Sequence, residues 1–289
     1  MIKTILTHPG GAHKDEFLAC SVLLALHAVP IVRREPTPEE LATPTVAVLD
    51  VGHRHEPARH NFDHHQLPRD HPPTCSLSLV LQHLGLYADA RQFCEWLEPA
   101  EWFDCRGPFA TAQWLGVDRE ILNQLSSPID ATLLRRFALA TRLEPGEPLW
   151  EVMRMMGTDL LDDVKTLRAR LDVLGQQAEF WELNLAGGPA PILFLPRTDP
   201  LPEDPSVGMD RFIASRGLSD QVVGLVYPDR RSAGYGLSRF RDNARLDFTR
   251  LAGHPAVHFA HARGFVAKTS ATDIGVLKKL LITAGTPTA

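Results

Sequence analysis

The stretch IKTILTHPGGAHKDE, residues 2–16, decides the N-terminal fold of this 289-residue chain. Its first part, Ile2 to Thr7, is mostly apolar or β-branched and predicts a buried strand. Pro9-Gly10-Gly11 then predicts a turn, and the Leu- and Ala-rich sequence from about Lys14 to Ala28 predicts a helix. The chain is therefore expected to open with a strand, a polar turn and a helix.

Two further segments complete the outline of a parallel sheet. Pro30 to Arg34 and Thr45 to Asp50 are largely apolar runs that predict strands, and strand, helix and strand at these spacings are typical of a parallel α/β sheet. Asp130 is the expected N-cap of one of the helices that follow. Helical patterns are seen at Ser76 to Leu84, Ala88 to Phe103, Asp130 to Arg142, Pro148 to Met156 and Thr158 to Leu185.

A second α/β unit is predicted beyond the last of these helices. The segment 186–191 is rich in glycine and proline and breaks the helical pattern. We therefore expect an α/β protein with two domains, residues 1–185 with a helical connector at the end, and a smaller domain of residues 186–289. The smaller domain has predicted strands near Ile192 to Leu195, Gln221 to Tyr227 and Tyr235 to Phe240, and a predicted helix at Thr272 to Ile282.

The composition is that of an ordinary soluble globular protein, 44% hydrophobic and 22% charged. The formal net charge of -5 gives no overall attraction to nucleic acid or anionic membranes, so a phosphate-bearing ligand would need metal ions or a local basic patch. No apolar run approaches the roughly eighteen residues of a membrane span, and no signal peptide is recognised. We expect reduced cysteines and a cytoplasmic location.

Histidine is concentrated in the first quarter of the chain, which indicates metal or acid–base chemistry there. Three polar clusters stand at or soon after the carboxyl ends of predicted strands. They are the loop with His8, His13 and Asp15, then Asp50, then Asp63-His64-His65. Ligands bind beyond these ends in an open parallel sheet, so the clusters are expected to meet in one small volume.

The residue types of these clusters suit a centre with two metals. Imidazole and carboxylate together favour manganese, iron, cobalt or zinc, and a carboxylate such as Asp50 can bridge two ions. Asp15, Asp50 and Asp104 would bring three negative charges to two divalent cations. Two such metals, about 3.5–4 Å apart, can activate water and stabilise the leaving oxygen of an in-line displacement.

The adjacent histidines of the third cluster are expected to divide their roles. Neighbouring side chains of an extended backbone point in opposite directions. His64 is therefore the expected metal ligand and His65 a hydrogen-bond donor to phosphate. Asp63 is expected to accept from an imidazole N–H and to fix its tautomer.

The motifs resemble those of the DHH phosphoesterase superfamily, and within it most closely the metal-dependent hydrolases of the melanocyte proliferating gene family. The resemblance rests on His8-Pro9-Gly10-Gly11-Ala12-His13-Lys14-Asp15-Glu16, Asp50-Val51-Gly52 and Asp63-His64-His65-Gln66. The superfamily includes single-strand-specific exonucleases, oligonucleotide and cyclic-dinucleotide phosphodiesterases, and manganese pyrophosphatases. Its members share a catalytic N-terminal α/β domain and a smaller C-terminal domain.

The resemblance implies a role for each motif position. It implies two divalent metal ions, Mn²⁺ in the first place, with Asp50 as the ligand that bridges them. It also implies that His65 and Asp63 are catalytic residues. Asp104, within Asp104-Cys105-Arg106-Gly107, matches the aspartate that follows a helix in the fourth motif. Residues 1–185 would be the catalytic domain and residues 186–289 a DHH-associated substrate-binding domain. The implied metal ligands are His8, His13, Asp15, Asp50, His64 and Asp104.

The C-terminal domain contains a candidate substrate loop. Gly253-His254-Pro255 and His261-Ala262-Arg263-Gly264-Phe265 resemble the glycine- and histidine-containing loop of DHH-associated domains, although the usual run of glycines is absent. Arginines outnumber acids between Asp229 and Lys268, which gives either a basic patch for a phosphate backbone or an ordinary solvated face. The predicted substrate-binding residues are His254, His261, Arg263, Gly264 and Arg239.

The sequence thus predicts a manganese-dependent phosphodiesterase that hydrolyses nucleic-acid ends or short oligonucleotides, with no membrane association and with an oligomeric state left open. One alternative is a hydrolase of a small phosphate compound, such as a dinucleotide or pyrophosphate. Pyrophosphate is disfavoured because no compact cluster of lysines and arginines is present to surround it. The other alternative is a non-catalytic module that binds metal or nucleic acid, which the nearly complete ligand set argues against.

Overall fold

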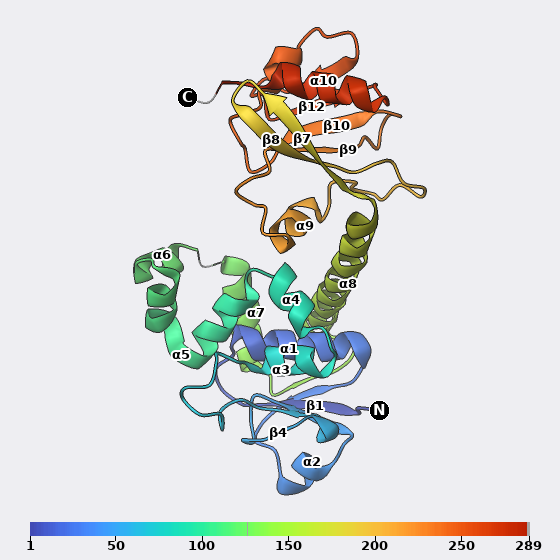
Figure 1. The fold of residues 1–289 in the computed structure, drawn as a ribbon. Helices are drawn as coiled ribbons and strands as arrows, with labels where there is room; N and C mark the ends of the chain where they lie inside the picture. Colours follow the sequence, from blue (N-terminus) through green and yellow to red (C-terminus); the bar gives the residue numbers. More distant parts are fainter. Residues whose placement is uncertain (126, 288–289) are drawn as a thin grey trace. The chain divides into compact units, whose positions relative to one another are not determined.

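The computed structural model describes residues 1–125 and 127–287. It divides into two units, Met1–Lys165 (unit 1) and Thr166–Ala289 (unit 2), within helix α8 (Pro148–Gln177) (Figure 1). The mixed α/β architecture with two sheets confirms the predicted fold class. The functional domain boundary proposed near Leu185 stays a prediction. Within the described residues, no helix is long and apolar enough to cross a membrane.

Unit 1 contains a six-stranded sheet in the order β4-β5-β3-β1-β2-β6. Its strands are β1 (Thr4–Thr7), β2 (Ile31–Arg33), β3 (Val46–Leu49), β4 (His55–Glu56), β5 (Asn61–Phe62) and β6 (Arg142–Leu143). Its other elements are α1 (Lys14–Leu26), α2 (Pro38–Ala42), η1 (Pro57–Arg59), α3 (Ser76–His83), α4 (Tyr87–Phe93), α5 (Leu97–Leu115), α6 (Arg119–Gln124), α7 (Pro128–Leu139) and the first part of α8.

The centre of this sheet is parallel, as the sequence predicts. Strand β1 pairs in parallel with β2 and β3, and β3 pairs in parallel with β5. The edge strands β4 and β6 are antiparallel to their neighbours. The carboxyl ends of β1, β3 and β5 therefore lie next to one another at one edge of the sheet, which is where a ligand site is expected.

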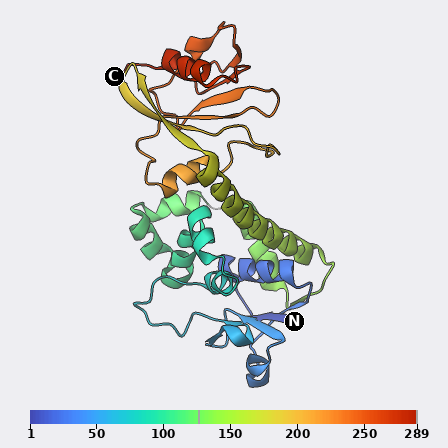
Figure 2. The ribbon, with the colours of Figure 1, turned by 45° about the vertical axis from the view of Figure 1, so that its right-hand side comes forward.

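Helix α1 lies next to α3 over one face of the sheet, with α2 on the opposite face (Figure 1, Figure 2). Every residue of α1 from Asp15 to Leu24 is buried. A helix that is apolar on all sides is stable only inside a core. Close packing continues at Gly157 of α8, where an added Cβ would lie 1.9 Å from the carbonyl oxygen of Ser21. The core thus fixes the N-terminus of α1 against the sheet edge.

Unit 2 contains a second six-stranded sheet, in the order β11-β12-β10-β9-β8-β7, which is antiparallel except where β8 pairs with β9. Figure 2 shows α10, drawn in red, against this sheet. Leu237, Phe248 and Leu281 are completely buried between them. The elements are β7 (Glu179–Leu185), β8 (Gly188–Phe194), α9 (Met209–Ser215), β9 (Gly224–Pro228), β10 (Tyr235–Arg239), η2 (Phe248–Leu251), β11 (Val257–Ala260), β12 (Val266–Thr269) and α10 (Ile274–Ala284).

Several details of the predicted helices are wrong. The helix predicted from Ala88 to Phe103 is two helices, α4 and α5, with a break at residues 94–96. Residues 179–185 form strand β7 rather than the end of a helix, because exposed and buried residues alternate along them. The two predicted helices around Gly157 form the single helix α8. Helix α7 is capped by Ser127, whose hydroxyl accepts from Ile129 N–H, while Asp130 forms an ion pair of 2.6 Å with Lys14.

Candidate metal centre

Three adjacent parallel strands deliver the polar side chains. His8 follows β1, Asp50 follows β3, and Asp63 follows β5. Asp50 adopts a left-handed backbone conformation with φ of 57°, which Asp tolerates better than most residues. The chain therefore turns sharply at the strand end while the Asp50 side chain, 2% exposed, points into the protein.

The N-terminus of α1 forms the next wall of the site. His13 is its N-cap, and the Glu16 carboxylate accepts from the His13 backbone N–H at 2.8 Å. Arg33, at the end of β2, donates to the carbonyl oxygens of Gly11 and Phe137, both at 2.8 Å. These contacts hold the glycine-containing turn and so fix where His13 and the first turn of α1 lie.

Helix α5 brings the predicted fourth-motif residue to the same place. The two oxygens of Asp104 lie 2.9 Å from His64 Nε2 and 3.7 Å from His13 Nδ1. The backbone breaks three residues later at Gly107, which has φ of 74° and lets the helical path change direction. Asp104 therefore joins residues that are distant in sequence.

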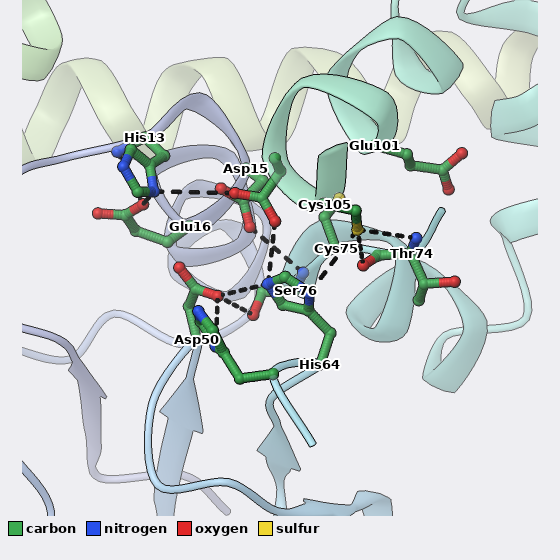
Figure 3. Close-up of polar contacts among 12 residues, drawn as sticks. His13, Asp15, Glu16, Asp50, His64, Thr74, Cys75, Ser76, Glu101 and Cys105 are labelled. Carbon is green, nitrogen blue, oxygen red and sulfur yellow. Dashed lines mark hydrogen bonds and ion pairs between the residues drawn. The ribbon is translucent and has the colours of Figure 1, made fainter. Parts of the chain in front are cut away.

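Asp50 belongs to three groups of potential ligands: two clusters of four residues, and a smaller group with His64 and His65. The ligand atoms of each cluster lie within 4.8 Å of one another. Asp50 Oδ2 lies 3.4 Å from His8 Nε2, and Asp50 Oδ1 lies 2.9 Å from His64 Nε2, so its two oxygens face different clusters (Figure 3). The first cluster is His8, His13, Glu16 and Asp50; the second cluster is Asp15, Asp50, His64 and Asp104.

Buried carboxylate oxygens of the second cluster lack the hydrogen bonds that such atoms normally make, which fits a bound metal ion. Asp15 is 1% exposed, and its Oδ2 accepts from Ser76 N–H at 3.3 Å. Within the described residues, its Oδ1 has no hydrogen-bond partner, and the buried Oδ2 of Asp104 has none apart from its 2.9 Å ion pair with His64 Nε2. Buried carboxylate oxygens are normally satisfied because leaving them unpaired is costly. A cation coordinated by oxygen and imidazole nitrogen would satisfy both.

The electrostatics of the clusters favour bound positive charge. Contacts with Asp50 and Glu16 raise the pKa of His8 to about 11. Burial lowers the pKa of His64, but its contacts with Asp104 and Asp50 outweigh burial and raise that pKa to about 12. Burial and the charge of Asp50 together raise the pKa of Asp15. The imidazoles of His8 and His64 therefore hold protons at neutral pH, and divalent cations can replace these protons.

The Asp63-His64-His65 triplet departs from one prediction. The rings of His64 and His65 do not point to opposite sides, because the chain leaves β5 at Phe62 and is no longer extended. Their centroids lie 4.5 Å apart, and His65 Nδ1 lies 3.7 Å from Asp50 Oδ1. As expected for Asp63, its Oδ1 lies 2.7 Å from His65 Nδ1, and its two oxygens also accept from the backbone N–H groups of His65 and His53.

Two residues near the centre were not singled out from the sequence. Glu16 lies inside the quoted motif, and its spacing from His13 is that of a capping box, but its 3.0 Å approach to His8 Nε2 depends on the fold. Cys105 lies in a group with His64 and Asp104 that could hold a metal ion. Its position next to Asp104 was the only sequence signal.

The predicted substrate-binding residues of unit 2 have several different environments. Arg239 donates to the carbonyl oxygen of Leu246 and to Asp242, so its guanidinium is already engaged. Gly264 has φ of 70°, and an added Cβ would lie 2.1 Å from Asp247 Oδ1. The rings of His254 and His261 both accept a backbone N–H at Nδ1, and the His261 ring packs 4.0 Å from that of Phe265.

The predicted basic patch is correspondingly reduced. Arg245 donates to the carbonyl oxygens of Pro189 and Gly188, and Arg250 donates to that of Thr283. Lys268 pairs with the buried Asp229 at 2.8 Å. These side chains are therefore already engaged with other groups of unit 2. Arg263, which is exposed, is the predicted phosphate-binding arginine that the loop presents at the surface.

Comparison with known proteins supports the N-terminal motifs. Residues 4–85 match the model of the Uncharacterised protein family (UPF0160), MYG1_exonuc. The MYG1 exonuclease of Homo sapiens is 46% identical over 63 residues, which are 21% of this chain and 16% of that protein. That of Mus musculus is 44% identical over 62 residues, again 21% of this chain and 16% of the relative. The match thus spans 16% of the length of these curated relatives.

Among solved structures, RecJ from Thermus thermophilus in complex with Mn²⁺ aligns with 98% of this chain and 52% of its own chain. The identity is 16% and the TM-score is 0.26. Through residues 4–85, which include the His8 to Glu16 motif, Asp50 and Asp63-His64-His65, this chain is similar to the MYG1 exonuclease family, as its motifs predict.

Proposed function

We propose that this protein is a metal-dependent phosphoesterase with two divalent metal ions, and that these are Mn²⁺, as the resemblance to the DHH phosphoesterases implies. The observation that carries the proposal is the pair of clusters that share Asp50. His8, His13 and Glu16 with Asp50 would hold one ion, and Asp15, His64 and Asp104 with Asp50 the other. The similarity of residues 4–85 to proteins called MYG1 exonucleases supports the same activity.

The position of Asp50 suits a ligand that both metal ions share. Its two oxygens face the two clusters from a single strand end, which suits one carboxylate that touches both ions. Ser76 Oγ donates to Phe62 O at 2.7 Å and also lies 3.4 Å from Asp50 Oδ1, which restricts the side chain. When bound, two metals activate water and stabilise the leaving oxygen. The protein would hold them through the buried carboxylates of Asp15, Glu16 and Asp50.

His65 is suited to bind the phosphoryl group. Its side chain is 50% exposed, in contrast to the 9% of His64. The hydrogen bond to Asp63 raises the pKa of His65 and so favours the charged ring, which donates to Asp63 from Nδ1. Nε2–H is then left to donate to a phosphate oxygen. Asp63 cannot turn away, because backbone N–H groups hold both of its oxygens.

The proposed substrates are phosphodiesters at nucleic-acid ends or in short oligonucleotides. The proposed division has residues 1–185 performing the chemistry and residues 186–289 holding the substrate. His261 and Arg263 are the proposed substrate contacts. His261 accepts the backbone N–H of Arg263 at Nδ1, so its neutral ring carries the proton on Nε2, where it can donate to phosphate.

The test is hydrolysis with Mn²⁺ of end-labelled single-stranded DNA and RNA, a dinucleotide and pyrophosphate. Asp50→Ala and His64→Ala are compared with His27→Ala, a matched control outside both clusters. We expect turnover of at least one phosphodiester, loss of it in the first two variants and its retention in the control. Mn²⁺-independent turnover, or equal turnover in all variants, would overturn the proposal. A ladder of products from a long strand would distinguish an exonuclease from a small-molecule hydrolase.

A further inference from the structure

Cys105 makes three contacts beside the second cluster. Its Sγ donates to the carbonyl oxygen of Thr74 at 2.8 Å and accepts from the Thr74 backbone N–H at 3.2 Å. The same sulfur lies 3.8 Å from His64 Nδ1. Figure 3 shows Cys105 between Thr74 and the His64 side of the site. Main-chain groups of one residue therefore fix the thiol.

The direction of these hydrogen bonds determines the tautomer of His64. A thiol has one hydrogen, and Cys105 gives it to the Thr74 carbonyl, which can only accept. Toward His64 the sulfur can therefore only accept, so Nδ1 must carry the hydrogen. The neutral imidazole of His64 then has its lone pair on Nε2.

In that neutral ring, the lone pair on Nε2 would face acidic oxygens that a cation could bind. His64 Nε2 lies 2.9 Å from Asp50 Oδ1 and 2.9 Å from Asp104 Oδ2. The Asp104 side chain is 9% exposed, and apart from that contact with His64 its Oδ2 has no hydrogen-bond partner within the described residues. The buried Asp15 Oδ1, in the same cluster, has none either among those residues. These oxygens mark the Nε2 side of the ring as the metal side.

We propose that Cys105 is a positioning residue that holds His64 as an Nε2 ligand without binding the metal itself. The inference rests on the proposed metal centre. In many metal sites, a carboxylate or carbonyl accepts a hydrogen bond from the ring nitrogen that does not bind the metal, and so fixes the orientation and tautomer of the histidine. In this protein the Cys105 thiol would be that acceptor. Thr74, through its main chain, anchors the thiol in turn.

The test measures Co²⁺ and Mn²⁺ affinity by calorimetry for wild type, Cys105→Ala and Cys105→Ser, with Cys94→Ala as matched control. We expect Cys105→Ala to weaken binding about 10–100-fold, the usual effect of losing such a partner. Cys105→Ser should bind within about threefold of wild type, because a hydroxyl also donates once and accepts. Thermal unfolding of each variant verifies that it is folded.

Two spectroscopic readouts on the wild type need no variant. With Zn²⁺ bound, ¹⁵N NMR should find the hydrogen of His64 on Nδ1, and Co²⁺ should give no sulfur charge-transfer band. Hydrogen on Nε2, a sulfur–cobalt band, or equal affinity of folded Cys105→Ala and Cys94→Ala would overturn the role of Cys105 alone. Failure of the wild type to bind any metal would overturn the metal centre and this role together.

Discussion

The contact between α8 and α1 at Gly157 allows a stability prediction that also affects the site. In Gly157→Ala the new Cβ would lie 1.9 Å from the carbonyl oxygen of Ser21 and 2.3 Å from its carbonyl carbon. Both atoms are main chain in a buried helix, so no side chain can rotate aside. The two helices would have to separate by about 1.5 Å to reach an ordinary contact distance of roughly 3.4 Å.

The expected cost follows from two opposing effects. Forcing an extra group into a packed core costs about 1–3 kcal/mol, and a clash with main chain belongs at the upper end. Alanine gains about 1 kcal/mol over glycine in helix propensity. The net loss is then about 2 kcal/mol, which for a unit of this size lowers Tm by about 4–8 °C. Because α1 carries Asp15 and Glu16, metal affinity should fall as well.

Gly175→Ala in the same helix is the matched control. The nearest atom to its added Cβ is Phe212 Cε2 at 4.0 Å, so nothing clashes. That variant should gain roughly 0.5–1 kcal/mol from helix propensity. Thermal and urea unfolding followed by circular dichroism measure both variants. If Gly157→Ala proves as stable as Gly175→Ala, the close packing of α8 on α1 is refuted.

The remaining predictions concern the metal and substrate. Mn²⁺ at about 100 times its Kd should stabilise the protein by about 2.7 kcal/mol, measured as a Tm increase that chelator reverses; an unchanged Tm argues against binding to the folded state. Since the pKa values of His8 and His64 are raised to about 11 and about 12, both are protonated at pH 7, and binding to neutral imidazole must release protons. Affinity should therefore rise from pH 6 to 9, and calorimetry in buffers of different ionisation enthalpy should detect the released protons; pH-independent affinity contradicts this. His261→Ala should raise KM for an oligonucleotide with little change in kcat, whereas a fall in kcat alone would place His261 in the chemistry.

The sheet edge and most of the centre could be predicted because the sequence signals were local. A short apolar strand followed by a histidine or aspartate predicts a side chain at the carboxyl edge, and β1 and β3 behave in this way. In the structure, β1, β3 and β5 are neighbours in the sheet, so His8, Asp50 and Asp63 lie at adjacent strand ends. Their assignment as ligands or catalytic groups stays a prediction that the metal and activity measurements decide.

What the sequence analysis missed depends on contacts between distant segments. Arg33 looks like the last residue of a strand, yet it holds the turn before α1 and pairs with the buried Glu16 at 3.3 Å. The thiol of Cys105 meets His64 only because α5 packs beside the sheet edge. Arg239 and Arg245 suggest a phosphate-binding face, but their guanidinium groups donate to main-chain carbonyls that no sequence pattern reveals. Strand β7 was missed because leucines at helical spacing run directly into it.

The most direct test of the two clusters around Asp50 is a Mn²⁺ titration followed by electron paramagnetic resonance, with wild type and Asp50→Asn side by side. The account predicts two ions per wild-type chain with the spectrum of an exchange-coupled pair, and loss of that coupled spectrum in Asp50→Asn. One ion per chain, or two ions that remain uncoupled in the wild type, would contradict a centre in which Asp50 joins two metals.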